Sequence, residues 1–438
     1  MKKLLTSIIS MMLVVIMAFG MTACGGGNGG GDDGIDAEGN TIVKIMFHVD
    51  KTSPEGKAYQ KRIQAFNEAY KDKKIKAQAI FKARTTGASN YETELQASKM
   101  EGSLADIITF DAPNTASYAN SGLLYDISNL ISAEEQAQFY SLNKYNGKLY
   151  GLPIQESSAG FYYNKKIFRD AGIDVGAFTA ENPWTFEQFE DVCARLKAHG
   201  VTAVDMRLDA TKDETAPYLL YPFIYAAGGS FVSEDGYTAT GYYNSAATAE
   251  GFQFIKNLIN SGYTSFEIGA TDFFTGKVGM YLSSGWTIPD LDNKYPQVFA
   301  SRDDWGLLPY PKDVVAASAT GSWSYAITNN HHEDKTAAVE LLKWMASAES
   351  TKVVTDATGM IPARRDVETN YAAGSPEHTL LKQLELSGIE RPVTVAYPTF
   401  STTFNQVIYG LKTDSVADLL RTATNTLQDE MNRLKDYK

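Results

Sequence analysis

Cysteine and histidine are scarce in this chain. Two cysteines and five histidines occur among 438 residues, and their spacing matches no metal-binding pattern. His331 and His332 precede an expected helix start, where we expect a solvated loop rather than a ligand pair. Cys193 follows Phe186 and Phe189 on one face of an expected helix, so we expect it to be a buried apolar residue. The sequence therefore predicts no metal and no cofactor.

Positive charge and catalytic motifs are also lacking. The net charge is −12 and no run of Lys and Arg occurs, which argues against a nucleic-acid partner because phosphate binding needs a basic surface. The chain has no G-x-S-x-G, no H-E-x-x-H and no P-loop. Carboxylates are abundant, so a pair that hydrolyses glycosidic bonds stays open as an alternative.

The longest apolar run is N-terminal and has the features of a targeting signal. Lys2 and Lys3 precede an apolar stretch, and Met21-Thr22-Ala23-Cys24 follows it. This order resembles a bacterial lipobox, in which the chain is cut before Cys24 and the cysteine is acylated; an ordinary secretory signal with a chance cysteine is the alternative. We predict a lipoprotein signal peptide at 1–23 and a glycine-rich flexible tether at 24–40. With Cys24 lipidated, no disulfide is available.

Strand and helix patterns alternate after the tether. Residues 41–49, 75–81 and 105–110 read as strands, with helices starting at Ser53-Pro54 and near Tyr91 between them. This order predicts an α/β fold with parallel pairing. Ligands of such sheets bind beyond the carboxyl ends of strands. Polar residues follow two of these strands and are expected at one rim: His48, Asp50, Lys51, Asp111 and Asn114.

The segment 151–165 joins this part to a second, longer one with its own pattern. Its apolar start, its polar middle at Gln155–Ser158 and its aromatic end predict a strand that leaves one core, exposes a short polar turn and enters another core. Glu156 would then face the gap between the cores. A surface hairpin is the alternative. Two later segments, 319–328 and 359–362, are expected to cross in the same way.

The later part of the chain continues the alternation. A capping box, Thr185 to Gln188, and Ser245 mark two helix starts, and Asp334 is expected to cap a third. A long helix is expected from Val416 to about Lys435. Two tryptophans, Trp286 and Trp323, lie near expected strand ends beside Gly or Ser. Aromatic rings there are typical of a pocket with an apolar body and a few polar groups, although core packing explains a single Trp equally well.

Short motifs in a fixed order resemble those of the extracellular solute-binding proteins of bacterial carbohydrate ABC importers, the maltose-binding-protein-like family. They extend over nearly all of the chain after the tether. They are Ser121-Gly122-Leu123-Leu124, Tyr145-Asn146-Gly147-Lys148, Tyr163-Asn164-Lys165, Pro183-Trp184-Thr185, and Pro217-Tyr218 through Gly228-Gly229.

The resemblance implies two α/β lobes of the type II periplasmic binding fold, joined by a three-segment hinge that closes around a ligand in the cleft. It places Glu156 on the hinge acid, Tyr218 and Trp286 on stacking positions of the second lobe, and Phe404 near another stacking position. His48, Asp50 and Lys51 fall on the loop after the first strand. Trp323 is a further stacking candidate, and Arg364 is either a ligand contact or a hinge ion-pair partner.

The chain departs from the family at two places. Pro113-Asn114 stands where the family has an Asp-Arg pair, with Asp111 two residues earlier, and Ala216 replaces an acid that contacts sugar. These changes argue against maltose itself. The implied lobes are 41–155 with 324–362, and 156–323 with 363–438.

From these observations we expect a lipid-anchored, extracellular binding component of an ABC importer. It would stand on the outer face of the cytoplasmic membrane as a monomer, capture an oligosaccharide and deliver it to permease subunits without performing chemistry. The alternatives are the same fold with another solute, such as a peptide, polyamine or ferric ion, or a secreted glycoside hydrolase or lyase.

Overall fold

The computed structural model describes residues 34–84, 91–210 and 213–435, which belong to two compact units, 1–41 and 42–438. In the first unit the Asp36 carboxylate accepts hydrogen bonds from the backbone N–H groups of Glu38 and Asn40, both at 2.9 Å, and Ile35 bridges to Thr41. Residues 34–40, predicted as the end of a flexible tether, therefore form a hydrogen-bonded turn. The predicted signal segment and Cys24 lie outside the described residues.

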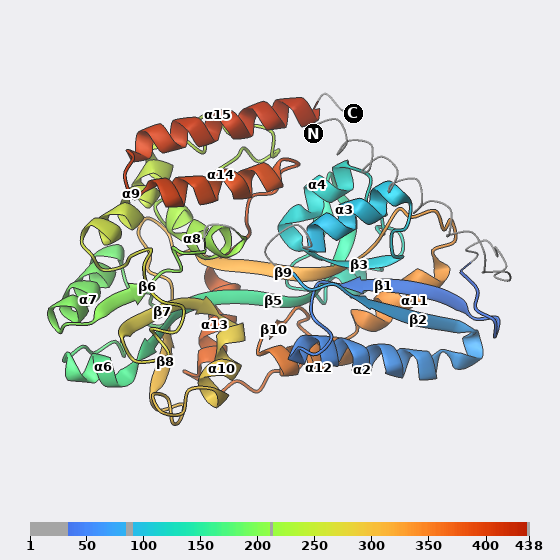
Figure 1. The fold of residues 1–438 in the computed structure, drawn as a ribbon, viewed down its shortest axis with the longest axis horizontal. Helices are drawn as coiled ribbons and strands as arrows, with labels where there is room; N and C mark the ends of the chain where they lie inside the picture. The colour runs from blue at the N-terminus through green and yellow to red at the C-terminus, as the bar shows by residue number, and fades with distance from the viewer. Residues whose placement is uncertain (1–33, 85–90, 211–212, 436–438) are drawn as a thin grey trace, which may run out of the picture. The chain divides into compact units, whose positions relative to one another are not determined.

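A mixed sheet runs through the second unit (Figure 1), in the order β2-β1-β3-β9-β5-β7-β6. These strands are β1 (Thr41–Phe47), β2 (Ile75–Phe81), β3 (Ile107–Asp111), β5 (Lys148–Asn164), β6 (Thr202–Asp205), β7 (Val278–Ser284) and β9 (Ser318–Ile327). Four short strands pair with β5 or β9: β4 (Asn143–Tyr145), β8 (Trp305–Leu308), β10 (Ile361–Pro362) and β11 (Gly388–Ile389). The predicted parallel pairing is confirmed for β1 with β3, and β6 with β7 is also parallel.

Strand β5 is the long connection through the unit. It pairs with β9 along residues 152–158 and with β7 along residues 159–163. The exposed turn predicted at Gln155–Ser158 is wrong, as is the alternative of a surface hairpin, because these residues are buried within one continuous strand. Their backbone groups pair with β9 and β10, and the register shift between Pro153 and Gln155 accommodates a proline that cannot donate.

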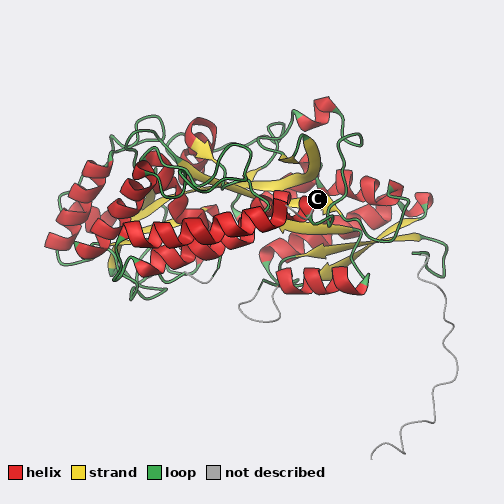
Figure 2. Cartoon of the chain, turned by 90° about the horizontal axis from the view of Figure 1, so that it is seen from above, coloured by secondary structure: helices red, strands yellow, loops and turns green. Residues whose placement is uncertain are grey.

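Helices lie on both sides of the strands (Figure 2). On the side of β1–β3 in Figure 1 lie α2 (Pro54–Ala69), α3 (Tyr91–Glu101), α4 (Thr115–Asn120), α11 (Thr336–Met345) and α12 (Ala348–Thr358), and the short α5 (Ala133–Gln136) follows α4 in the chain. The others are α6 (Lys165–Asp170), α7 (Phe186–Ala198), α8 (Thr215–Ala226), α9 (Ala246–Asn260), α10 (Ile288–Asn293), α13 (Pro376–Ser387), α14 (Tyr397–Gly410) and α15 (Val416–Lys435). Single 3-10 turns occur at η1 (Lys71–Lys73), η2 (Ala112–Asn114) and η3 (Gly285–Thr287).

The predicted helix starts are mostly confirmed. Ser53 and Ser245 accept capping bonds from the helix backbone, and Thr185 with Gln188 forms the full capping box. A cap at Asp334 implies a helix that begins at Lys335, but α11 begins one residue later, at Thr336. The Asp334 carboxylate accepts a hydrogen bond from the backbone N–H of Thr336. Helices α5, α6, α10, α12, α13 and α14 were not predicted.

Among the described residues, the two largest of four hydrophobic clusters lie toward opposite ends of the sheet, and we name the parts around these two cores the first lobe and the second lobe. The first core includes Ile45, Phe66, Leu152, Tyr325 and Leu342; the second includes Phe161, Leu220, Cys193, Phe400 and Leu427. The prediction that Cys193 is buried is confirmed.

The crossings between the lobes follow from these cores. Strand β5 leaves the first core at Ile154 and enters the second at Ala159, and β9 returns between Ala319 and Tyr325. At the third crossing Ile361 packs in a further cluster with Tyr162 and Tyr281, and Ala363 packs in the first core.

Candidate functional site

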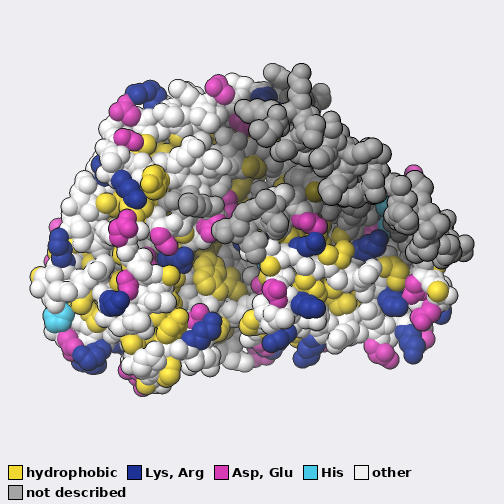
Figure 3. Space-filling model, viewed as in Figure 1, with side chains coloured by type: hydrophobic (Ala, Val, Ile, Leu, Met, Phe, Trp, Pro, Cys, Tyr) yellow, Lys and Arg dark blue, Asp and Glu magenta, His cyan; other side chains and the backbone are white. Residues whose placement is uncertain are grey.

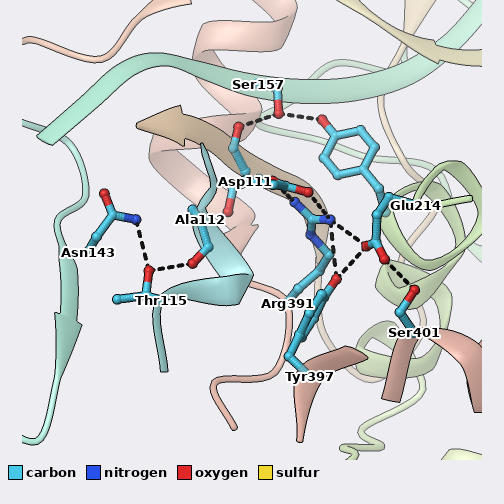
Figure 4. A network of polar contacts seen from close by, with 12 residues as sticks. Asp111, Ala112, Thr115, Asn143, Ser157, Glu214, Arg391, Tyr397 and Ser401 are labelled. Atoms are coloured by element: carbon cyan, nitrogen blue, oxygen red, sulfur yellow. Dashed lines mark hydrogen bonds and ion pairs between the residues drawn. The ribbon is translucent and has the colours of Figure 1, made fainter. Parts of the chain in front are cut away.

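A network of charged and polar groups joins the end of β3 to the second lobe (Figure 4). The guanidinium of Arg391 donates to both carboxylate oxygens of Asp111, at 3.0 and 2.7 Å, and to Glu214 at 3.0 Å. Tyr397 donates its hydroxyl to Glu214 at 2.6 Å, and Ser401 donates to the other oxygen of Glu214. One buried cation is therefore held by two carboxylates from different parts of the chain.

Glu156 lies on β5, between the two cores. Its side chain is 1% exposed and accepts a hydrogen bond from the Ser141 hydroxyl. Burial, with the negative charge of Glu390 as a smaller cause, raises the pKa of Glu156 to about 8, and the Ser141 bond acts in the opposite direction. Its carboxyl group is therefore mainly neutral at pH 7.

Two aromatic rings lie beside these polar groups. The rings of Tyr218, on α8, and Trp286, in η3, are tilted with centroids 5.8 Å apart. The Tyr218 hydroxyl donates to Ser157 on β5 at 2.7 Å, and the Arg391 guanidinium lies 5.4 Å from the centre of the Tyr218 ring. Trp286 is 43% exposed, so much of this large apolar side chain is open to a solute.

The first lobe holds a second aromatic group. Trp323, on β9, stacks on the ring of His48 with centroids 3.4 Å apart and planes 5° apart, and Arg84 lies 5.0 Å from the Trp323 centroid. Burial and the nearby Arg84 lower the pKa of His48 well below its usual value, so His48 is neutral at pH 7. Since His48 covers one face of Trp323, less of this ring is open to stacking than of Trp286.

The remaining predicted residues are distributed over different surroundings. Asp50 and Lys51 are exposed in the loop before α2, where Thr52 donates to the Asp50 carboxylate. Asn114 ends η2 and is half-buried, one turn from Asp111.

Arg364 and Phe404 are not part of the group around Arg391. Arg364 donates two hydrogen bonds to the Asp366 carboxylate, at 2.8 and 2.7 Å, and one to the carbonyl of Ala346. Arg364 was expected to be either a ligand contact or an ion-pair partner, and the structure contains an ion pair. Phe404 is fully buried in the second core, with Phe231, Phe252 and Phe400 around it. No face of the Phe404 ring reaches solvent.

The structure thus brings Asp111, Glu156, Tyr218 and Trp286 together around residues that the sequence did not indicate: Arg391, Glu214, Tyr397, Ser141 and Ser157. Arg391 and Asp111 are 280 positions apart, and no local pattern pairs them. A weak signal existed in Glu214, three residues before the Pro217-Tyr218 motif.

A small cavity adjoins Arg391. Its volume is about 50 Å³, and the residues that line it come from both lobes and from β5 and β9, including Thr115, Asn143, Glu156, Thr320 and Glu390. Pockets for drug-sized ligands have about 300–1,000 Å³, so this space accepts water but not a sugar ring. A solute of that size needs the lobes to lie further apart here.

Among the described residues no three His, Cys, Asp or Glu side chains are grouped so that they could hold a metal ion. In the same part of the chain, every helix is too short or too polar to cross a bilayer.

Two α/β lobes joined by crossing strands, with polar and aromatic groups between them, define the class of two-lobe solute-binding folds. The chain matches the family model of the bacterial extracellular solute-binding proteins over residues 50–352, and it belongs to this family. Solved structures show the same fold: the cyclic α-maltosyl-1,6-maltose binding protein of Arthrobacter globiformis superposes with a TM-score of 0.75 at 23% identity, over 90% of this chain and all of that one.

Curated relatives differ in the solutes that their names state. The diacetylchitobiose binding protein of Streptomyces coelicolor is 24% identical over 379 residues, 81% of each chain. The sn-glycerol-3-phosphate-binding periplasmic protein of Salmonella paratyphi A is 23% identical over 350 residues, 73% of this chain and 74% of the relative. The chain spans about half (54%) of the length of other curated binding proteins that it matches.

Proposed function

We propose that this protein is the binding component of an ABC importer and captures a neutral oligosaccharide between its lobes. The observation that carries the proposal is the exposure of Trp286. This large aromatic residue is 43% exposed and lies beside Tyr218, close to buried polar groups such as Glu156 and Ser157. The apolar faces of sugar rings gain from contact with such an aromatic surface, while their hydroxyl groups need the hydrogen-bond partners that Glu156 and its neighbours supply.

The charges around Arg391 support a neutral solute over an anionic one. Its guanidinium is already paired with two carboxylates, Asp111 and Glu214, and a phosphate would have to displace Asp111 and then lie close to Glu214. Repulsion between like charges in a poorly hydrated site is costly. The relative that binds sn-glycerol 3-phosphate nevertheless makes a phosphorylated polyol the second candidate.

The wider assignments rest on the family and on the predicted signal. We propose that closure of the lobes around the solute produces the form that a permease recognises, and that Cys24 carries lipid that holds the protein at the outer face of the cytoplasmic membrane. We further propose that the protein performs no chemistry on its solute and acts as a monomer.

A thermal-shift screen of the purified protein against mono- and oligosaccharides, with sn-glycerol 3-phosphate as a separate arm, tests the solute class. A solute present at 100 times its dissociation constant adds about 2.7 kcal/mol to the stability of the folded state, which is a shift of a few degrees. We expect a shift for one oligosaccharide series, no new reducing ends after incubation, and loss of the shift in Trp286→Ala.

The matched control is Tyr409→Ala, since Tyr409 is an exposed aromatic residue whose ring contacts Phe266 and Lys412 rather than the site. This variant should keep the shift. A response to sn-glycerol 3-phosphate alone, or an unchanged response in Trp286→Ala, would contradict the proposal.

A further inference from the structure

The bond between Arg391 and Asp111 connects the two lobes. Asp111 ends β3, which lies beside β1 and packs in the first core through Ile107. Arg391 follows β11, which pairs with the start of β9 and packs against the second core through Ile389. Both side chains are buried, with that of Arg391 4% and that of Asp111 9% exposed. Two parallel hydrogen bonds of 2.7 and 3.0 Å therefore cross from one lobe to the other.

The second lobe holds the guanidinium independently of Asp111. Glu214 precedes α8, and its carboxylate accepts a hydrogen bond from the Arg391 Nη1 at 3.0 Å. The Tyr397 hydroxyl lies 3.2 Å from the same Nη1. If the lobes separated, Asp111 would leave with the first lobe and gain water, while Glu214 would still neutralise Arg391. A buried cation that keeps one carboxylate avoids most of the cost of an unpaired charge, so this interaction can open and close reversibly.

Glycine 321, on β9, gives Arg391 the space it needs. A Cβ atom at this position would lie 3.0 Å from the Arg391 Nη2 and 3.4 Å from the Tyr218 ring. The guanidinium thus passes directly over the backbone of the crossing strand, close to the Tyr218 ring at 5.4 Å. A methyl group here would press on the end of the Arg391 side chain, which would have to move by a few tenths of an ångström, without removing any charge.

These contacts change the role expected for Asp111. Both of its oxygens accept a bond from Arg391, so in this arrangement about half of the carboxylate's acceptor sites are used by the other lobe. We propose that Arg391 is a positioning residue that holds the lobes closed through Asp111, and that this bond between the lobes is the main role of Asp111. The proposal rests on the two-lobe fold and does not depend on which solute the cleft takes.

The test measures the distance between the lobes with no solute present. Spin labels are placed on cysteines introduced at two exposed positions, Lys57 on α2 and Glu250 on α9. The full chain also carries Cys24→Ser, which removes one native thiol. The other native cysteine, Cys193, is buried and should stay unlabelled. Pulsed electron resonance then gives the distribution of distances in the parent chain, in Arg391→Met, in Asp111→Asn and in the double variant.

We expect each single variant to raise the ratio of separated to closed lobes by at least about tenfold, since hydrogen bonds between charged groups contribute about 1.5–3 kcal/mol. The double variant should do no more than either single one, because both remove the same bond. Arg364→Met is the matched control: Arg364 is also buried and paired, but its partner Asp366 is two residues away, so its loss should leave the distances unchanged.

Gly321→Ala keeps the test decisive if Arg391→Met does not fold, because it presses on the guanidinium and retains every charge. It should change the distances in the same direction as Arg391→Met, but by less. Distances that stay at the parent value in Asp111→Asn and Gly321→Ala, or that lengthen equally in Arg364→Met, would overturn the proposal.

Discussion

The buried carboxyl group of Glu156 should make the stability of the protein depend on pH. Its pKa is raised to about 8 in the folded state, from an ordinary value of 4.5, mainly by burial. Between these two values the unfolded chain has released the proton and the folded chain has kept it. The folded state then binds more protons, so the free energy of unfolding falls as the pH rises from about 4.5 to about 8.

The size of this effect follows from the shift. Each unit of pKa difference corresponds to 1.36 kcal/mol, so Glu156 should lower stability by about 3 kcal/mol at pH 7 relative to pH 4, and by up to about 5 kcal/mol above pH 8. Glu156→Gln has nearly the same shape and no proton to lose. It should match the parent near pH 4 and exceed it in stability by several kcal/mol at pH 8.5.

Urea denaturation of both proteins at pH 4.5, 6, 7 and 8.5 measures the difference. Glu134→Gln, on the exposed face of α5, serves as the control and should follow the parent at every pH. If the curves of Glu156→Gln and the parent run parallel from pH 4.5 to 8.5, the argument from burial is refuted.

Two further substitutions test the packing that surrounds the site. Phe404→Ala removes a fully buried ring and should lower the free energy of unfolding by about 3–5 kcal/mol in chemical denaturation; a loss of solute affinity without loss of stability would contradict its core position. Gly285→Ala places a Cβ 2.5 Å from the carbonyl oxygen of Gly359 at the third crossing, one residue before Trp286. It should cost about 1–3 kcal/mol of stability and weaken solute binding in the thermal-shift assay, whereas the exposed Gly176→Ala should change neither.

Local signals in the sequence predicted several helix starts, although the serine caps of α12 at Ser347 and of α13 at Ser375 were missed. The caps at Ser53, Ser245 and Thr185 depend on a side chain and a backbone N–H within three residues. The unpredicted α14 begins at Tyr397-Pro398 without a side-chain cap, so its start carried no such signal.

Burial was predicted less well, because it depends on what packs against a segment. Gln155–Ser158 reads as an exposed polar turn, yet the structure buries it between β9 and other strands that satisfy its backbone groups. Phe404 resembles a stacking position of the family, but the rings of Phe231 and Phe400 enclose it. In both cases the residue's own chemistry left two environments open.

The sequence by itself determined the alternation of strands and helices, the crossing segments and a small set of polar and aromatic candidates, because hydrophobic period, caps and motif order are local properties. The tertiary structure alone decided that Asp111 meets Arg391 rather than open solvent, that Glu156 keeps its proton near neutral pH, and that Trp286 is more open than Trp323. These outcomes depend on which residues come close together and lose their contact with water, and such residues can be up to 280 positions apart in the chain. The order of residues alone therefore does not show them.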